Sequence, residues 1–190
     1  MPRILAMAGS ARKASFNKKL VAEAAERARD AGAEVTLVDL RDYPMPLYDG
    51  DLEAESGIPE QAKALRSLML EHHGLLLACP EYNGSITPLL KNTIDWVSRP
   101  DDDLPPTAAF AGKTATLLAT SPGALGGLRG LVHVRSILGG IGVLVLPKQV
   151  AVGKAFQVFG GDEPDFDDRT RASLDKAVQA LVDATRKLHD

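Results

Sequence analysis

Short runs of apolar residues alternate along this chain with longer stretches in which apolar residues recur every three or four positions. A short apolar run is typical of a buried strand, and the longer period is typical of a helix that buries one face. The pattern is clearest at the start, where the apolar run of residues 3–8 precedes a helix predicted over residues 16–30. The predicted buried face of this helix comprises Leu20, Val21, Ala24, Ala25 and Ala28.

The same patterns extend over the rest of the chain. The predicted strands cover residues 3–8, 34–38, 74–79, 113–119 and 143–146. The predicted helices cover about residues 16–30, 59–72, 88–97, 128–138 and 169–188, and two proline-containing loops cover residues 43–50 and 100–106. Strands that alternate with helices indicate an α/β fold with an open parallel sheet and helices on both faces. There is no repeat, low-complexity tract or linker, so residues 1–190 are expected to form one domain.

Three polar or glycine-rich loops follow the first, third and fourth predicted strands. Ligands of open parallel sheets bind beyond the carboxyl ends of the strands, near the point where the strand order reverses. We therefore expect the three loops to meet at one edge of the sheet and to form a ligand site there.

Composition narrows the classes of function. The formal net charge is −3, whereas binding to a nucleic-acid backbone needs a basic surface. No apolar run approaches the length of a membrane span, and no secretion signal opens the chain. The single Cys79 excludes an internal disulfide, suits a reducing cytoplasm and is expected to be buried. His72 and His73 are adjacent and lack further ligands at metal-binding spacing, so no metal site is predicted.

The first loop, residues 9–17, is suited to an anion. Ser10, Ser15 and Asn17 carry side-chain donors, and Arg12 can form a two-pronged contact with phosphate oxygens. The predicted helix that follows adds unpaired N–H groups and a partial positive charge. The spacing fits neither a P-loop nor a dinucleotide glycine motif. The alternative is an ordinary turn in which a serine or asparagine caps the helix.

The second and third loops are suited to a flat ligand. Asn83-Gly84 is a strong turn signal, and Tyr82 beside it has a ring that could cover a heterocycle. The alternative is a loop in which Tyr82 and Trp96 only pack. The third loop, residues 120–127, keeps its side chains small, which lets backbone approach a planar molecule closely. The alternative is a flexible connection to the next helix.

Two motifs carry a family resemblance. They are Gly9-Ser10-x-Arg12-x-x-Ser15-x-Asn17, and Pro80-Glu81-Tyr82-Asn83-Gly84-Ser85 followed by Leu90-Lys91-Asn92-x-x-Asp95-Trp96. Together they resemble the NAD(P)H-dependent FMN reductase family, which includes chromate and quinone reductases, and the resemblance runs from Arg3 to about Pro147. It implies a flavodoxin-like, three-layer α/β/α fold with strand order 2-1-3-4-5. It also implies FMN as cofactor, NADPH or NADH as electron donor, and a homodimer or homotetramer with Trp96 and Arg99 on interface segments.

The resemblance also implies site residues. The cofactor-binding residues of the first loop would be Ser10, Arg12, Ser15, Phe16 and Asn17, mainly around the FMN phosphate. Those bordering the isoalloxazine ring would be Pro80, Glu81, Tyr82, Asn83, Gly84 and Ser85 on one side and Ser121, Pro122 and Gly123 on the other. His133 and Arg135 are candidates for the nicotinamide-nucleotide phosphate, or else for a surface or subunit contact.

The implied activity is the reduction of quinones, flavins or similar small acceptors by hydride transfer through bound FMN. The flavin carries the reactive chemistry, so no residue is predicted to act as an acid or base. The alternative is a flavodoxin-type electron carrier without NAD(P)H oxidation. Such carriers are usually more acidic and lack an arginine in the phosphate loop, so Arg12 and the mild net charge disfavour it. The role of the segment after Ala151 stays open.

Overall fold

The computed structural model describes residues 1–101 and 103–189, and within them five strands form a single parallel sheet. The strand order is β2-β1-β3-β4-β5, which confirms the predicted flavodoxin-like topology. The strands are β1 (Arg3–Ala8), β2 (Glu34–Asp39), β3 (Gly74–Ala78), β4 (Thr114–Thr120) and β5 (Leu144–Val152). The α-helices are α1 (Phe16–Asp30), α2 (Gly50–Ser56), α3 (Glu60–Leu70), α4 (Pro88–Val97), α5 (Leu128–Gly140), α6 (Ala155–Val158) and α7 (Asp168–His189), and a 3-10 turn covers Leu40–Asp42.

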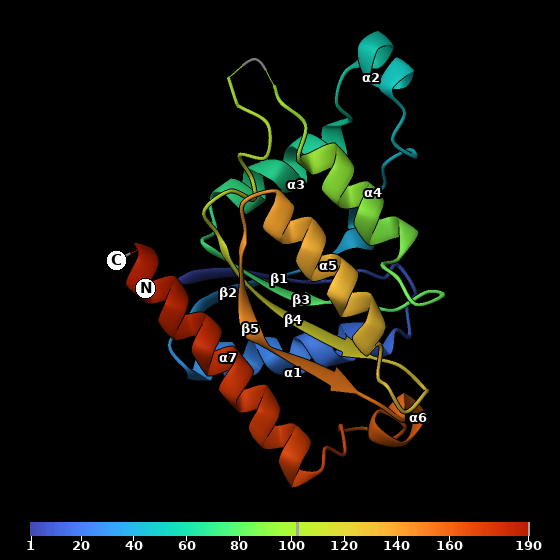
Figure 1. Cartoon of the computed structure of the whole chain (residues 1–190), viewed down its shortest axis with the longest axis vertical. Helices are drawn as coiled ribbons and strands as arrows, with labels where there is room; N and C mark the ends of the chain where they lie inside the picture. Colours follow the sequence, from blue (N-terminus) through green and yellow to red (C-terminus); the bar gives the residue numbers. More distant parts are fainter. Residues whose placement is uncertain (102, 190) are drawn as a thin grey trace.

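Helices cover both faces of the sheet (Figure 1). Successive strand residues point to opposite faces, so Leu75 and Leu76 of β3 enter different cores. One core lies under α1 and α7, and the other lies under α3, α4 and α5. All five residues of β3 are buried, as expected for a strand between two neighbours with helices on either side.

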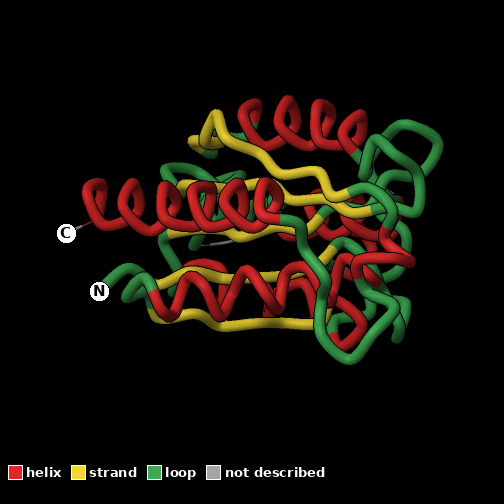
Figure 2. Tube along the Cα trace, turned by 90° about the horizontal axis from the view of Figure 1, so that it is seen from below, coloured by secondary structure: helices red, strands yellow, loops and turns green. Residues whose placement is uncertain are grey.

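All strands run in the same direction, so their carboxyl ends share one edge. Figure 2 shows both termini at one end of the sheet and a concentration of loops at the other. The loops after β1, β3 and β4 leave from this second end. The fold therefore delivers the three predicted ligand loops to one place.

Strand β5 is longer than predicted. The sequence pattern ends the strand at Leu146, because Pro147 has no N–H to donate to a ladder. The observed strand continues to Val152 as an edge strand, where proline is tolerated. Its register against β4 shifts between Ala115 and Leu117, and Pro147 falls within this bulge.

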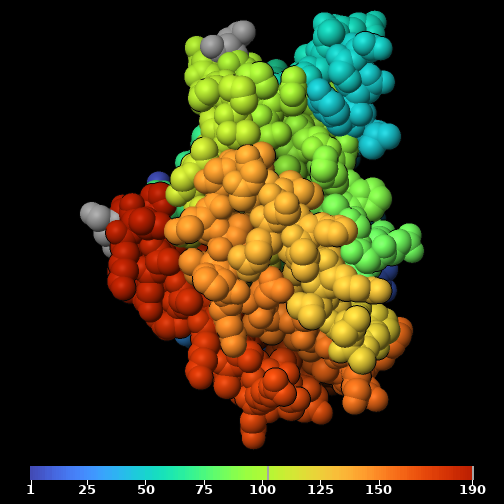
Figure 3. All heavy atoms as spheres, viewed as in Figure 1, coloured from blue at the N-terminus to red at the C-terminus, as the bar shows by residue number. Residues whose placement is uncertain are grey.

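Two short helices were not predicted. Helix α2 has no buried residue, so it carries no apolar period. Its N-cap is Asp49, whose carboxylate accepts a hydrogen bond from the Asp51 N–H at 2.8 Å. Helix α6 has only four residues. Helix α2 projects from one end of the molecule (Figure 3). No helix in the described residues is long and apolar enough to cross a bilayer.

Candidate functional site

A cavity of about 300 Å³ lies at the edge of the sheet where the three loops meet. Its lining residues are Ser10, Arg12, Ser15, Phe16, Asn17, Pro80, Glu81, Tyr82, Thr120, Ser121, Pro122 and Phe156. The structure thus brings all the predicted first-loop residues together with most of those predicted in the other two loops. Asn83, Gly84, Ser85 and Gly123 were also predicted but do not line this cavity.

Another hollow, of about 390 Å³, lies against α6 and the start of α7. It is lined by a different set of residues that includes Lys154, Asp165 and Asp167. These charges are of mixed sign, and none of them comes from the three ligand loops, which contribute only Ala124 to the lining. Most of the residues predicted from the sequence to bind a ligand therefore line the smaller cavity.

The first loop leaves its polar groups facing the cavity. Ser15 occupies the N-cap position of α1 and is buried, but its hydroxyl makes no capping hydrogen bond. The Ser10 hydroxyl accepts a hydrogen bond from the Arg12 N–H at 3.3 Å. Helix α1 begins at Phe16, so its first N–H groups have no partner within the helix. The simple capping alternative is wrong for Ser15, and the loop presents donors around the start of a helix.

Arg12 gives the cavity a cationic group. Its guanidinium carbon lies 5.4 Å from the centroid of the Phe16 ring, a cation–π arrangement that orients an exposed side chain. Within the described residues no carboxylate forms an ion pair with Arg12. Its charge is therefore available to an anion bound beside α1.

Asn17 joins the first loop to the end of β4. Its amide nitrogen donates to the Thr120 carbonyl oxygen at 2.9 Å, and its amide oxygen accepts from the Thr120 N–H at 3.0 Å. Both bonds are buried. Asn17 lines the cavity, but most of its hydrogen-bonding capacity holds two of the three loops together.

The second loop is a two-residue β-hairpin. Tyr82 and Ser85 exchange backbone hydrogen bonds of 3.0 Å in both directions. Asn83 and Gly84 between them have φ angles of 52° and 80°, the left-handed values that an Asn-Gly hairpin turn requires. The Tyr82 side chain is 56% exposed at the cavity wall, so it is not a core residue.

Glu81 enters the cavity wall with a largely buried side chain, 8% exposed. Its Oε1 accepts hydrogen bonds from Nε and Nη2 of Arg129, at 2.9 and 2.5 Å. Its Oε2 accepts from the Gly130 N–H at 3.0 Å. Burial raises the pKa of Glu81, but these hydrogen bonds and the Arg129 charge outweigh it and leave the pKa below its ordinary value. Glu81 is therefore ionised at neutral pH.

The third loop approaches β5 and α6 closely. The Ser121 N–H donates to the Val152 carbonyl at 3.2 Å, and the Ala155 N–H donates to the Ser121 carbonyl at 3.1 Å. Gly126 has φ +63°, and a Cβ at this position would lie 2.6 Å from the Val152 carbonyl carbon. Small size is therefore a packing requirement at Gly126 and does not by itself indicate a planar ligand.

Phe156 is a site residue that the sequence did not place in the cavity of its own chain. It lines the cavity from α6, is 70% exposed, and meets the Phe16 ring edge-to-face at 5.2 Å between centroids. An aromatic residue shortly after the last strand was visible in the sequence, but no local pattern places it beside Phe16. The contact forms because the chain, after leaving β5, turns back toward the third loop and so brings α6 beside the cavity.

Three further residues have clear environments. Cys79 is fully buried, as predicted, and burial raises its pKa to about 12, so it is not a nucleophile at neutral pH. Arg135 donates to the carbonyls of Val145 and Leu146 at 3.0 and 2.8 Å, which commits it to the β5 bulge and not to a nucleotide phosphate. His133 is exposed, and its Nδ1 lies 2.7 Å from the Ser85 hydroxyl.

Comparison with known proteins gives consistent results. A family model described as NADPH-dependent FMN reductase matches residues 2–157. An NAD(P)H-dependent FMN reductase of Pseudomonas aeruginosa is 34% identical over 187 residues, which cover 98% of this chain and 96% of that protein. A quinone reductase of Escherichia coli is 36% identical over 157 residues, or 82% of this chain and 79% of that protein. Among solved structures, the flavoenzyme NAD(P)H:(acceptor) oxidoreductase FerB of Paracoccus denitrificans is similar with a TM-score of 0.82 and 27% identity over 98% of both chains.

Proposed function

The chain belongs to the NADPH-dependent FMN reductase family, and from this premise we propose that it binds FMN in the 300 Å³ cavity and uses NADPH or NADH to reduce quinones, flavins or similar small acceptors. The P. aeruginosa and E. coli relatives are named for reductase activities. These names support the proposal that the chain is an enzyme and not a flavodoxin-type electron carrier.

The observation that carries this proposal is the anion cradle at the start of α1. The buried Ser15 hydroxyl makes no capping bond, and Arg12 has no carboxylate partner in the described part of the chain. Beside them lie the unpartnered N–H groups of the helix. A phosphate monoester suits this set, because it accepts several hydrogen bonds and its charge opposes that of Arg12 and the helix dipole. These groups would hold the phosphate of FMN.

The remaining cavity wall fits a flat ring system. The wall is built from Pro80, the hairpin residue Tyr82 and the loop residues Ser121 and Pro122. We propose that the isoalloxazine ring lies between the second and third loops, with Asn83, Gly84, Ser85 and Gly123 just outside its border. Bound FMN supplies the hydride-transfer chemistry. The chain itself binds and orients the cofactor and leaves one side open to donor and acceptor.

Anaerobic stopped-flow absorbance on the FMN-loaded protein tests this function. Mixing with NADPH or NADH should bleach the flavin band rapidly, and adding a quinone should restore it, since a reductase carries out both half-reactions. The faster nucleotide identifies the donor. A protein that binds FMN but is bleached by neither nucleotide would instead be an electron carrier fed by another protein.

We also propose that residues 1–190 form one domain that assembles into a homodimer or homotetramer in the cytoplasm, where its nicotinamide donors are found. The helix α2, which projects from the body (Figure 3), supports an assembly role, because hydrogen bonds attach it and the segment before it to the end of α4. Arg99 donates to Glu53 of α2 at 2.8 Å, and the buried Trp96 donates to the Pro46 carbonyl at 2.8 Å. Leu47 nearby is 78% exposed.

Sedimentation velocity tests the proposed assembly. The protein should sediment as a dimer or tetramer, and a monomer at micromolar concentration would contradict the assembly.

A further inference from the structure

Helix α5 begins without a cap of its own. Its N-cap residue, Gly127, has no side chain, and its first turn contains no acidic residue. A helix start normally receives an acceptor from a serine, threonine, aspartate or asparagine at that position. Here the acceptor comes from the hairpin, 49 positions earlier in the chain, because Glu81 Oε2 accepts from the Gly130 N–H at 3.0 Å.

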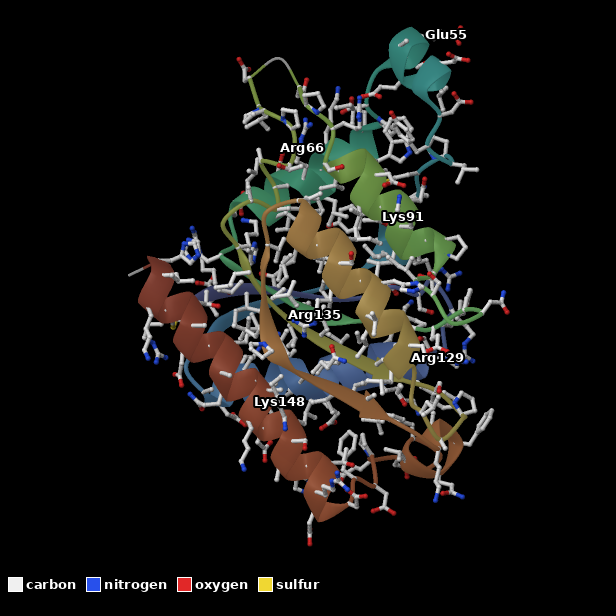
Figure 4. All side chains as sticks on the ribbon, viewed as in Figure 1. Glu55, Arg66, Lys91, Arg129, Arg135 and Lys148 are labelled. Carbon is white, nitrogen blue, oxygen red and sulfur yellow. The ribbon has the colours of Figure 1, made fainter. Side chains whose placement is uncertain are left out.

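The same carboxylate also binds the first turn of α5 through its side chain. Glu81 Oε1 accepts two hydrogen bonds from Arg129, which extends from the start of α5 (Figure 4). A carboxylate at this position satisfies an unpaired N–H group and opposes the positive end of the helix dipole. Three hydrogen bonds from two adjacent residues hold the Glu81 side chain in one orientation.

The hairpin and α5 are also packed without a gap. Gly130 is buried, and a Cβ there would lie 3.2 Å from the Ser85 carbonyl oxygen and 3.3 Å from Glu81 Cβ. At the other end of the hairpin, Ser85 Oγ lies 2.7 Å from His133 Nδ1. Both ends of the hairpin are thus tied to one face of α5.

We propose that Glu81 is a positioning residue that acts through α5: by capping this helix from outside, it fixes the 80–85 hairpin in the orientation in which it borders the flavin. The proposal rests on the proposed FMN site, and it replaces a direct flavin contact as the main role of the Glu81 carboxylate. The carboxylate oxygens already bind Arg129 and Gly130, so the hairpin backbone and Tyr82 are the groups left to face a ligand.

The substitution Glu81→Gln tests the proposal with little change in shape. It replaces one acceptor oxygen by an NH₂ donor, which must face either Arg129 or the Gly130 N–H, both of them donors. We expect faster hydrogen exchange at the Tyr82 and Ser85 amides in the protein without FMN. We also expect roughly ten-fold weaker FMN binding and altered visible circular dichroism of the bound flavin.

Asp167→Asn is the matched control. Asp167 accepts a hydrogen bond from the Thr170 N–H at 2.6 Å at the start of α7, outside the FMN cavity. This variant also removes one negative charge from the start of a helix. It should leave the amide hydrogen exchange of the hairpin, the FMN affinity and the visible circular dichroism of the bound flavin unchanged. An equal loss of FMN affinity in both variants would mean that the effect is general destabilisation, which overturns the proposal.

A second variant separates the ion pair from the cap. Arg129→Lys keeps a cation beside Glu81 and leaves the Gly130 bond in place, so it should retain most of the FMN affinity that Glu81→Gln loses. Unchanged hairpin exchange or unchanged FMN binding in Glu81→Gln overturns the positioning role. Failure of the parent protein to bind FMN overturns the proposed function instead, and the exchange measurement still reports on the cap.

Discussion

Replacing Arg12 with alanine should weaken FMN binding by about 1.5–3 kcal/mol, which corresponds to roughly a 10- to 150-fold higher Kd. The guanidinium lies at the cavity wall, is oriented over Phe16 and has no carboxylate partner in the described residues. A phosphate is the group in FMN that its charge would bind. Titration of the protein with FMN, followed by quenching of flavin fluorescence, measures the change.

Two comparisons make the Arg12 result specific. Lys13 is the neighbouring cation, is exposed and does not line the cavity, so Lys13→Ala should leave the FMN Kd close to that of the parent. Riboflavin lacks the phosphate, so Arg12→Ala should leave riboflavin binding nearly unchanged. Equal FMN affinity in Arg12→Ala and the parent protein would place the phosphate elsewhere and remove the main support for the proposed site.

Asn17→Ala should lower the free energy of unfolding by about 2–4 kcal/mol, because the N–H and C=O of Thr120 would both lose a buried hydrogen-bond partner. For a chain of this size the expected fall in Tm is roughly 5–15 °C. The same substitution releases the first loop from the end of β4, so FMN affinity should fall as well. Thermal unfolding followed by far-UV circular dichroism, and the same FMN titration, measure the two effects.

Asn92 provides a control with the same bonding pattern in another place. Its amide accepts from the Tyr48 N–H at 2.8 Å and donates to the Pro46 carbonyl at 2.9 Å, away from the cavity. Because this pair of bonds is less buried, Asn92→Ala should cost less stability and leave FMN binding unchanged. If Asn17→Ala kept the parent Tm, the two-sided clamp on Thr120 would not contribute to stability as argued.

The elements that the sequence predicted well are those with a strong local pattern. Helix α1 was predicted with its bounds and its buried face, because its apolar residues recur with the helical period over 15 residues. Strand β3 was identifiable as central because all its residues are apolar. By contrast, α2 buries nothing, and Pro147 interrupts β5 as the fourth of its nine residues, so local rules had no signal for α2 or for the part of β5 beyond Leu146.

For the site, the sequence predicted the residue types and the loops that carry them, but it did not predict the structural role of each side chain. The alternation of strands and helices was enough to place three polar loops at one sheet edge. It could not show that the Ser15 hydroxyl makes no capping hydrogen bond, or that Phe156 lies at the cavity beside Phe16. These facts depend on how separate elements pack.

By itself, the sequence determined the parallel α/β fold, the edge at which the loops gather and the residue types on which the predicted anion site in the first loop rests. These properties follow from local periodicity and from residue types within a few positions of one another. Only the tertiary structure decided which polar groups remain available to a ligand. Asn17 and Thr120 are 103 positions apart, and Glu81 and Gly130 are 49 apart. Hydrogen bonds over such separations exist only when the packed sheet and helices bring both partners to one place, so no local pattern can reveal them.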